Sequence, residues 1–325
     1  MRAAVYRRFG GPEVVRVEEV ETPAPREGEV LVRVAASVVS TADAAMRSGS
    51  PFAARLFAGP FRPRLPVLGA DFAGAVAAIG PGVESRRVGD AVWGVTAAGM
   101  RAHAEYVVVP ADGVLEPLPD GLDPVDAAAL IDPTALSFLD DTAELRAGQT
   151  ILVNGASGAV GTAAVQLAVH RGATVTAVCS AERASVVRDL GAHEILDYRE
   201  GDVVERLRAE ERSFDVVFDV FGNLGYRRAR ALLTPTGRYC STVPTPAILW
   251  YTLRTRRSAG RRGVIAFTGL RHRDAVHDDL SETAELFRAG VLRPVVDTVY
   301  PLDRAAEAHA HVERGKAGHI VLSMS

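Results

Sequence analysis

The sequence predicts an α/β protein with a mostly β domain and a second domain built on a parallel sheet. With 325 residues, the chain is about twice as long as a common single domain. Up to about residue 119, short β-like runs alternate with Gly and Pro, and beyond Pro119 the pattern changes to strand, glycine-rich turn and helix. Strands that alternate with helices at this spacing imply a parallel sheet.

The elements follow from where the apolar runs begin and end. In the first region, the predicted strands cover residues 14–20, 30–39, 74–79, 90–95 and 106–109. In the second region, we expect strands at 150–153, 174–179 and 214–220, with helices over 160–170 and 183–190. The last part predicts a helix over 278–289, a strand over 295–300, a helix from 303 to about 313 and a final strand at 320–322. We expect this last part to rejoin the first domain.

The composition favours a small-molecule partner in a reducing cytoplasm. The net charge is −3 with acids and bases interspersed, so no global field attracts nucleic acid or an anionic membrane. Two cysteines, Cys179 and Cys240, are too few for a disulfide framework. The N-terminus lacks the apolar stretch of a signal peptide, and the apolar run over 127–139 is interrupted by Asp132 and too short to cross a bilayer. We therefore expect a soluble, cytoplasmic protein.

A glycine-rich turn predicts a nicotinamide dinucleotide site. It reads Asn154-Gly155-Ala156-Ser157-Gly158-Ala159-Val160-Gly161. An apolar strand runs into the turn and a helix leaves it, as pyrophosphate binding at a helix N-terminus requires. Small residues let the backbone N–H groups reach the phosphates, and Gly161 lets the helix lie close to its strand. The alternative is an ordinary tight turn between a strand and a helix.

The end of the next strand favours NADPH over NADH. A carboxylate there pairs with the ribose 2′-hydroxyl of NAD, whereas a 2′-phosphate needs donors and positive charge. No acid occupies the strand tip, and Ser180 with Arg183 can hydrogen-bond a phosphate. Two alternatives stay open. Arg183 can be an ordinary exposed charge on a helix, and Glu182 can either point into solvent or favour NAD.

Five further motifs accompany the turn along nearly the whole chain. They are LGADFAG (68–74), VGDAVWG (88–94), AEY (104–106), DYREGD (197–202) and FDVVFD (214–219). Together they resemble the medium-chain dehydrogenase/reductases, specifically the zinc-independent quinone oxidoreductase branch. The resemblance implies a GroES-like β domain over residues 1–119 and 265–325, and a Rossmann domain with a doubly wound parallel sheet over residues 120–264. It also implies a cofactor in the cleft between them and, in many members, a homodimer.

The resemblance also assigns cofactor contacts by position. Arg183 and Tyr198 would contact the 2′-phosphate, with Arg314 as a further candidate, although Tyr198 is equally explained as an aromatic packed at a strand end. Thr134, Val243 and the segment Phe267-Thr268-Gly269 would lie near the nicotinamide half. The predicted cofactor-binding residues are therefore Thr134, Gly155, Ser157, Gly158, Ala159, Val160, Gly161, Ser180, Arg183, Tyr198, Val243, Phe267, Thr268 and Arg314.

The sequence argues against a bound metal. The zinc branch of the family has Cys where this chain has Ser40, a His-Glu pair where it has Ala70-Asp71, and a four-Cys lobe that two distant cysteines cannot form. His309 and His311 are two apart on a predicted helix and face different ways. Without a metal to polarise an alcohol, reduction of an activated acceptor is the better hypothesis.

The expected chemistry is hydride transfer from nicotinamide C4 to a quinone or to the β-carbon of an enone. Ser40 and Thr134 are the candidate catalytic residues, and Ser40 can donate to a substrate oxygen. However, the family usually has Asn-Pro at Ser40-Thr41 and often Tyr at Ala45. These departures keep a second class open, a cofactor-binding protein with a structural or cyclisation-type biosynthetic role. A zinc-free sugar or alcohol dehydrogenase is the third.

Three further side chains have two interpretations each. Asp43 either caps a helix or contacts substrate, Trp93 is either core or a stacking wall for a flat acceptor, and Asp132 is either a helix cap or a proton relay. Ser40, Asp43 and Trp93 are thus the predicted substrate contacts. The segment 248–262 is apolar and then rich in arginine, which predicts a helix near a dimer contact, a substrate lid or a clamp for an anionic acceptor.

Overall fold

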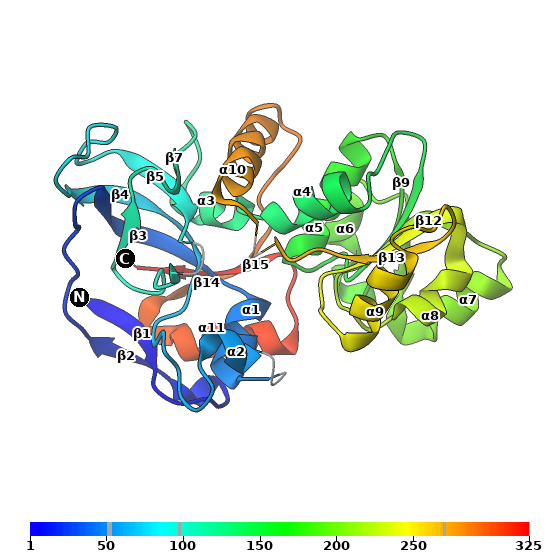
Figure 1. The fold of residues 1–325 in the computed structure, drawn as a ribbon, viewed down its shortest axis with the longest axis horizontal. Helices are drawn as coiled ribbons and strands as arrows, with labels where there is room; N and C mark the ends of the chain where they lie inside the picture. Colours follow the sequence, from blue (N-terminus) through cyan, green and yellow to red (C-terminus); the bar gives the residue numbers. More distant parts are fainter. Residues whose placement is uncertain (51–53, 97–98, 269–270, 325) are drawn as a thin grey trace. The chain divides into compact units, whose positions relative to one another are not determined.

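The computed structural model describes residues 1–50, 54–96, 99–268 and 271–324, and the chain divides into two compact units (Figure 1). The β-rich unit contains Met1–Ile131, His272–Arg288 and Arg293–Ser325, and the parallel-sheet unit contains Asp132–Arg271 and Ala289–Leu292. The predicted α/β class, with one β-rich and one parallel-sheet domain, is confirmed. Among the described residues, no helix is both long enough and apolar enough to cross a bilayer.

The β-rich unit holds a seven-stranded sheet of order β14-β15-β3-β4-β5-β7, to which β6 is added by pairing with β3, and a two-stranded sheet of β1 and β2. C-terminal β15 pairs antiparallel with β3, with Ile320 opposite Val39, and parallel with β14. The strands are β1 (Arg2–Tyr6), β2 (Val15–Glu19), β3 (Glu29–Val39), β4 (Asp71–Ile79), β5 (Ala91–Val95), β6 (Tyr106–Pro110), β7 (Val114–Pro117), β14 (Val296–Pro301) and β15 (His319–Ser323). The helices are α1 (Thr41–Ser48), α2 (Ala54–Ala58), α3 (Pro124–Leu130), α10 (Arg273–Arg288) and α11 (Ala305–Arg314).

The first compact unit extends to Ile131, beyond the expected change at residue 119. The reason is α3, which packs on β3, β4 and β15. Its Ala128 and Ala129 are buried in one cluster with Val38 and Val321. The small side chains let the helix approach the sheet closely, so these residues belong to the β-rich unit.

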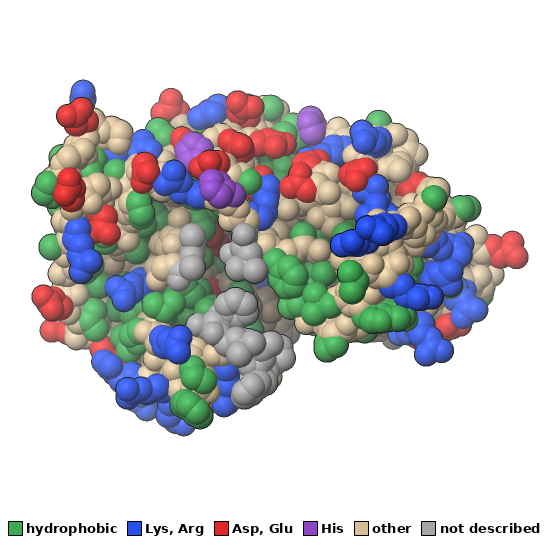
Figure 2. Space-filling view, in the orientation of Figure 1, with side chains coloured by type: hydrophobic (Ala, Val, Ile, Leu, Met, Phe, Trp, Pro, Cys, Tyr) green, Lys and Arg blue, Asp and Glu red, His purple; other side chains and the backbone are tan. Residues whose placement is uncertain are grey.

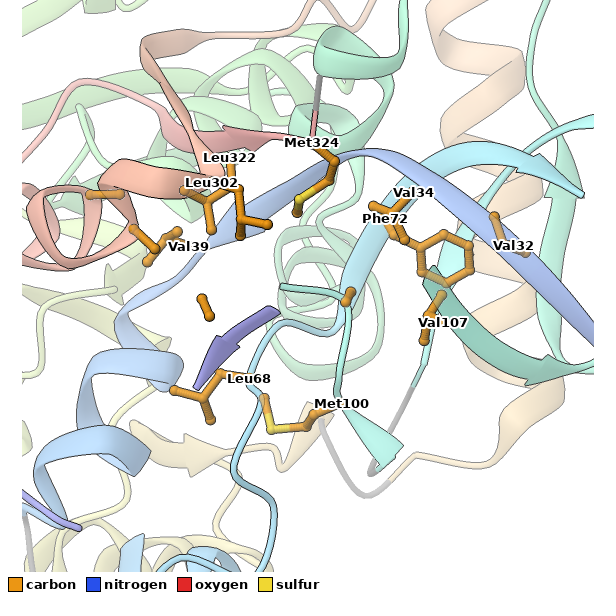
Figure 3. Packing of buried hydrophobic residues seen from close by; sticks show 14 of the residues in the cluster. Val32, Val34, Val39, Leu68, Phe72, Met100, Val107, Leu302, Leu322 and Met324 are labelled. Carbon is orange, nitrogen blue, oxygen red and sulfur yellow. The ribbon is translucent and has the colours of Figure 1, made fainter. Parts of the chain in front are cut away.

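The core of the β-rich unit joins both ends of the chain (Figure 3). Phe72 of β4 is fully buried beside Val34 of β3 and faces Val107 of β6. Leu322, from the C-terminal strand, is buried in the same cluster. Alternating side chains along antiparallel strands therefore supply one continuous apolar layer.

The parallel-sheet unit contains a six-stranded sheet of order β10-β9-β8-β11-β12-β13 in which every neighbouring pair is parallel. Strands are added on one side of β8 first and then on the other, so the order reverses between β8 and β11. In such sheets, ligands bind at the carboxyl ends of the strands at this reversal. The strands are β8 (Thr150–Asn154), β9 (Thr174–Cys179), β10 (Glu194–Asp197), β11 (Phe214–Asp219), β12 (Leu233–Ser241) and β13 (Arg262–Ile265).

The helices of this unit are α4 (Pro133–Ser137), α5 (Ala159–His170), α6 (Ala184–Asp189), α7 (Val203–Ala209), α8 (Tyr226–Ala229) and α9 (Pro246–Thr255). The described strand β13 and the residues that follow it belong to this unit, so its second boundary lies after Arg271 and not after residue 264. Cys179 and Cys240 are free thiols buried in the sheet, and burial raises the pKa of Cys240 to about 12. Both therefore act as small apolar side chains.

Candidate dinucleotide site

The glycine-rich turn lies between β8 and α5, at the carboxyl end of β8. Gly155 has φ +85°, a conformation that other residues rarely adopt. The N–H groups of Gly155 and Ala156 donate to the carbonyl of Val178 at 3.1 and 3.0 Å, which ties the turn to β9. A Cβ on Gly161 would lie 2.2 Å from the Gly155 carbonyl oxygen, so only glycine lets α5 approach the turn this closely.

The N-terminus of α5 is open toward a ligand. Its N-cap residue, Gly158, offers no side-chain hydrogen bond to the helix. The first N–H groups of the helix, beginning at Ala159, have no intrahelical acceptor, and the helix dipole favours an anion there. A Cβ on Gly158 would meet the Gly155 carbonyl oxygen at an ordinary 3.5 Å, so no protein atom requires glycine at this position. The turn therefore fits a pyrophosphate, for which it supplies donors and space.

A buried carboxylate, Asp219 at the end of β11, fixes the loop beside the turn. One of its oxygens accepts from Asn154 Nδ2 (2.7 Å) and the Gly222 N–H (2.8 Å). The other accepts from the Leu224 N–H (2.9 Å) and the Tyr239 hydroxyl (2.7 Å). Burial and this carboxylate raise the pKa of Tyr239, so the phenol stays a donor. Sequence reasoning missed Asp219, although an acid that ends an apolar strand next to β8 was the available signal.

Ser180 and Arg183, which are predicted to bind a 2′-phosphate, follow the carboxyl end of β9. The Ser180 hydroxyl is buried and has no hydrogen-bond partner among the described residues. Such an orphan is costly unless a ligand or water satisfies it. Arg183 is half-buried and forms no ion pair within the described part of the chain. A buried acceptor or donor and an unpaired cation match the chemistry of a phosphate.

Glu182, which left the cofactor choice open in the sequence, is engaged by a neighbour. Its two carboxylate oxygens accept from Arg199 at 2.8 and 3.3 Å, and this contact lowers the pKa of Glu182. Tyr198 is 51% exposed, so part of its ring is open to a ligand, and its contact with the 2′-phosphate stays a prediction beside the packed-aromatic interpretation. The Arg199 guanidinium lies 5.9 Å from the centre of the Tyr198 ring.

The residues predicted to lie near the nicotinamide half come from two places in the parallel-sheet unit. Some lie after the strands β12 and β13, and Thr134 lies in the first turn of α4. Thr134 in α4 and Thr268 after β13 are brought together, with their hydroxyl oxygens 3.4 Å apart. Val243, after β12, lies against Gly222, where an added Cβ would come within 2.6 Å of it. Phe267 is 47% exposed, and Gly269 lies outside the described residues. Asp132 caps α4 by accepting from the Ala135 N–H, as the cap interpretation predicts.

In the β-rich unit, Ser40 and Asp43 form a helix cap. Ser40 is the N-cap of α1, and Asp43 is the third residue within that helix. The Ser40 hydroxyl donates to Asp43 Oδ2 at 2.6 Å and accepts from the Asp43 N–H at 3.1 Å. Asp43 Oδ1 accepts from the Gly69 N–H at 3.0 Å. Since the Asp43 side chain is buried and bonded within the protein, its prediction as a substrate contact is wrong.

Trp93 and Arg314 also lie in the β-rich unit. Trp93 lies in β5 and is 0% exposed, so it is a core residue and its predicted stacking on substrate is wrong. Its burial follows from the strands β4 and β7 on either side of β5. Arg314 is exposed in the last turn of α11 and belongs to the β-rich unit, whereas Arg183 and Tyr198 belong to the other.

The apolar and basic segment after β12 forms α9 and β13. Of the α9 side chains, Ile248 is buried, whereas Leu249, Trp250 and Leu253 are 43, 54 and 66% exposed. Figure 2 shows hydrophobic side chains open to solvent in the region of α9. Arg261 donates to the carbonyls of Leu233 and Thr234, so part of the basic cluster has a structural role.

No group of three His, Cys, Asp or Glu side chains is arranged to hold a metal ion in the part of the chain that the structure describes. Ser40, which stands where the zinc branch has a Cys ligand, is the N-cap of α1.

Comparisons with known proteins match the whole chain. Residues 26–120 match the family model described as the alcohol dehydrogenase GroES-like domain, and residues 190–322 match that described as zinc-binding dehydrogenase. The quinone oxidoreductase of Sus scrofa is 32% identical over 337 residues, which cover 99% of this chain and 97% of that protein.

Solved structures agree with these matches. The quinone oxidoreductase from Coxiella burnetii superposes with a TM-score of 0.87 at 27% identity and covers 100% of this chain and 99% of that one. The CurF ER cyclopropanase from the curacin A biosynthetic pathway superposes with a TM-score of 0.88 at 24% identity, over 100% of this chain and 99% of that one. At that identity, the second likeness shows the fold alone.

Proposed function

Because this chain belongs to the quinone oxidoreductase branch of the medium-chain dehydrogenase/reductase superfamily, a superfamily of oxidoreductases, we propose that it reduces quinones or α,β-unsaturated carbonyl compounds with NADPH. Nicotinamide dinucleotide binding is expected for the family. The proposal goes further, to NADPH as the cofactor, to the class of acceptor and to a mechanism without zinc.

One observation carries the choice of NADPH. At the tip of β9, the unpartnered Ser180 hydroxyl and the unpaired Arg183 stand beside a Glu182 whose carboxylate is bound by Arg199. A 2′-phosphate needs donors and positive charge, and a free carboxylate would repel it. Tyr198 is exposed beside these groups and can donate its hydroxyl.

The roles of the chain's own residues follow from their positions. The turn of Gly155, Ser157, Gly158, Ala159, Val160 and Gly161 binds the pyrophosphate, and Asp219 holds the adjoining loop. Thr134 and Thr268 position the nicotinamide half, with Val243 and Phe267 as its apolar contacts. When bound, NADPH supplies the hydride for the reduction. Thr134 is the candidate donor to the acceptor's oxygen.

The hydrogen bond from Ser40 to Asp43 favours a second candidate function, which involves no redox reaction. The single proton of the Ser40 hydroxyl is donated to Asp43, so in this arrangement the hydroxyl has no proton to donate to a substrate oxygen. A family member that lacks this donor, and also lacks the Tyr common at the position of Ala45, fits a structural or cyclisation-type role that holds the cofactor without redox turnover.

Absorbance of NADPH and of NADH, followed with a panel of quinones and enones, tests the function. We expect oxidation of NADPH in preference to NADH by at least one acceptor. Tight NADPH binding without oxidation by any acceptor would favour the non-redox class. Arg183→Ala should raise the KM for NADPH much more than the KM for NADH, because it removes charge from the 2′-phosphate site. Arg188→Ala removes an exposed charge from α6, the helix whose N-cap residue is Arg183, and is the matched control.

We further propose that the protein works as a homodimer in the cytoplasm, with a small-molecule substrate. The resemblance to family members over the whole chain and the exposed apolar side chains of α9 support self-association. Light scattering tests the dimer, and a monomer mass at micromolar concentration would contradict it.

A further inference from the structure

Glu182 poses an electrostatic problem for the proposed NADPH site. It lies two residues after Ser180 and next to Arg183, in the short turn that follows β9. A 2′-phosphate carries close to two negative charges, and a free carboxylate at this turn would repel it. The same carboxylate, if free, could accept a hydrogen bond from the ribose 2′-hydroxyl of NADH. The state of Glu182 therefore bears directly on cofactor preference.

Arg199 engages Glu182 with both arms of its guanidinium, at 2.8 and 3.3 Å. The ion pair is open to solvent, with side chains 52 and 68% exposed, and such pairs contribute little to folding stability. Stability therefore does not account for the arrangement. A paired carboxylate, in contrast, presents less negative charge to a neighbouring anion and has fewer free lone pairs for a ribose.

Besides Glu182, Arg199 contacts Asp197 through its backbone and Tyr198 through its guanidinium. Its backbone N–H donates to Asp197 Oδ1 at 2.8 Å, and the other oxygen of Asp197 accepts from the Ala181 N–H at 3.0 Å. Asp197 thus joins the turn after β10 to the turn after β9. The guanidinium also lies over the Tyr198 ring. Asp197 at the end of β10 and Glu182 in the turn after β9 consequently both have their oxygens directed to donors of the chain.

We propose that Arg199 is a specificity-determining positioning residue, which favours NADPH by pairing with Glu182 and so removing a repulsive carboxylate from the 2′-phosphate site. Arg183 and Ser180 bind the phosphate, and Arg199 acts through Glu182. The inference rests on the proposed use of NADPH.

Adenosine 2′,5′-bisphosphate and 5′-AMP are the probes, because they differ by the 2′-phosphate and their binding by titration calorimetry needs no turnover. Arg199→Ala should weaken the bisphosphate about tenfold through the freed charge of Glu182, and leave 5′-AMP within about twofold. The loss should shrink at high salt, since exposed charges are screened. Arg199→Lys should retain most of the affinity. Arg208→Ala, which breaks the similarly exposed Arg208–Glu205 pair, is the matched control and should change neither affinity.

The double variant Glu182→Gln with Arg199→Ala decides the mechanism. If Arg199 acts through Glu182, removing the carboxylate restores bisphosphate affinity to within about twofold of the wild type. A double variant as weak as Arg199→Ala would show that Arg199 binds the phosphate directly, which overturns the proposal. An unchanged affinity in Arg199→Ala alone would overturn it too.

Different results would contradict the use of NADPH and the role of Arg199. If the unmodified protein binds the bisphosphate no better than 5′-AMP, and Arg183→Ala has no effect, then the NADPH proposal fails. If that preference and the Arg183 effect are present but Arg199→Ala keeps the preference, only the role of Arg199 fails.

Discussion

Among the described residues, the two units differ in their buried polar groups, because the buried histidines all lie in the β-rich unit. In the parallel-sheet unit, the buried carboxylate of Asp219 accepts hydrogen bonds from Asn154, Gly222, Leu224 and Tyr239. In the β-rich unit, buried polar atoms lack a partner among the described residues. They include the Tyr6 hydroxyl and one ring nitrogen each of His103, His309 and His319.

The hydrogen bonds of Asp219 fix a loop, whereas the buried histidines make the stability of the β-rich unit depend on pH. A buried charge with a full set of donors fixes the backbone around it, here the loop beside the glycine turn. Burial disfavours the charged ring, and it lowers the pKa of His309 and of His319 to about 3. The buried Ser180 hydroxyl, directly after β9, is one of the side-chain atoms of the parallel-sheet unit without a partner in the described part of the chain, as are Thr252 Oγ1 and Arg262 Nε.

The sharpest way to break the comparison is Asp219→Ala. Removing the carboxylate leaves four buried donors without an acceptor, and we expect the free energy of unfolding to fall by about 3–5 kcal/mol. Urea denaturation measures this, and hydrogen exchange should localise the loss to the parallel-sheet unit. Glu205→Ala removes an exposed carboxylate of the same unit and should cost less than about 1 kcal/mol. Equal losses in the two variants would show that the network does not stabilise this unit.

Acid should destabilise the β-rich unit first. The folded pKa of His309 and of His319 lies below the unfolded value of about 6.5, so the unfolded chain binds protons first. The stability from the neutral rings is complete above about pH 6.5 and is lost toward pH 3, by about 1.4 kcal/mol per pH unit for each histidine. Hydrogen exchange at pH 7 and pH 5 should show protection falling in this unit.

The replacement His309→Met supplies the control for the acid effect. It fills the site with an apolar side chain that does not titrate, so it should remove about half of the slope of stability against pH. His309 faces His103, Asp43 and Arg47, and His319 faces Lys316. A slope unchanged by the replacement would mean that these neighbours, and not His309, carry the pH dependence.

A smaller effect is expected at the cap of α1. Ser40→Ala removes the side-chain acceptor for the Asp43 N–H and should cost about 1 kcal/mol of unfolding free energy. Thr41→Ala, at the exposed next residue, is the control. No loss in Ser40→Ala would show that the cap does not matter to the unit. Unchanged turnover in this variant would further show that the hydroxyl takes no part in the chemistry.

The smallest change in stability, with a large change in binding, is expected at Gly158. Its added Cβ makes only an ordinary contact, so Gly158→Ala should leave the unfolding free energy within about 0.5 kcal/mol and weaken dinucleotide binding. Gly161→Ala, whose Cβ would collide with the Gly155 carbonyl, should lose stability as well. Intrinsic fluorescence titration with NADPH and a thermal melt separate the two outcomes. Undiminished binding in Gly158→Ala would place the pyrophosphate elsewhere.

The sequence predicts the turn of the site well because its requirements are local. Gly155 and Gly161 are glycines for reasons of φ and of close approach within a few residues, and such constraints are visible in a pattern. Strand β9 also has the predicted bounds. In contrast, β1, β7, β10, β12 and β13 were missed, although each pairs with a strand nearby in the sequence. In β12, Pro235 and Gly237 interrupt the apolar pattern that would have indicated a strand.

Side-chain roles that depend on distant neighbours were not predictable. Trp93 is buried because β4 and β7 flank its strand, and nothing near it in the sequence distinguishes a core tryptophan from a stacking wall. The Glu182–Arg199 pair joins turns that follow two neighbouring strands. Asp219 was visible as an acid at the end of an apolar strand, but its four partners come from three separate segments.

The pairing of β15 with β3 has a consequence for synthesis on the ribosome. Val39 cannot meet Ile320 until nearly the whole chain has been translated, whereas the described strands of the parallel sheet lie between Thr150 and Ile265. The parallel-sheet unit can therefore fold while the nascent chain is still growing. Strand β3 must wait, with an apolar edge exposed, until β15 has emerged.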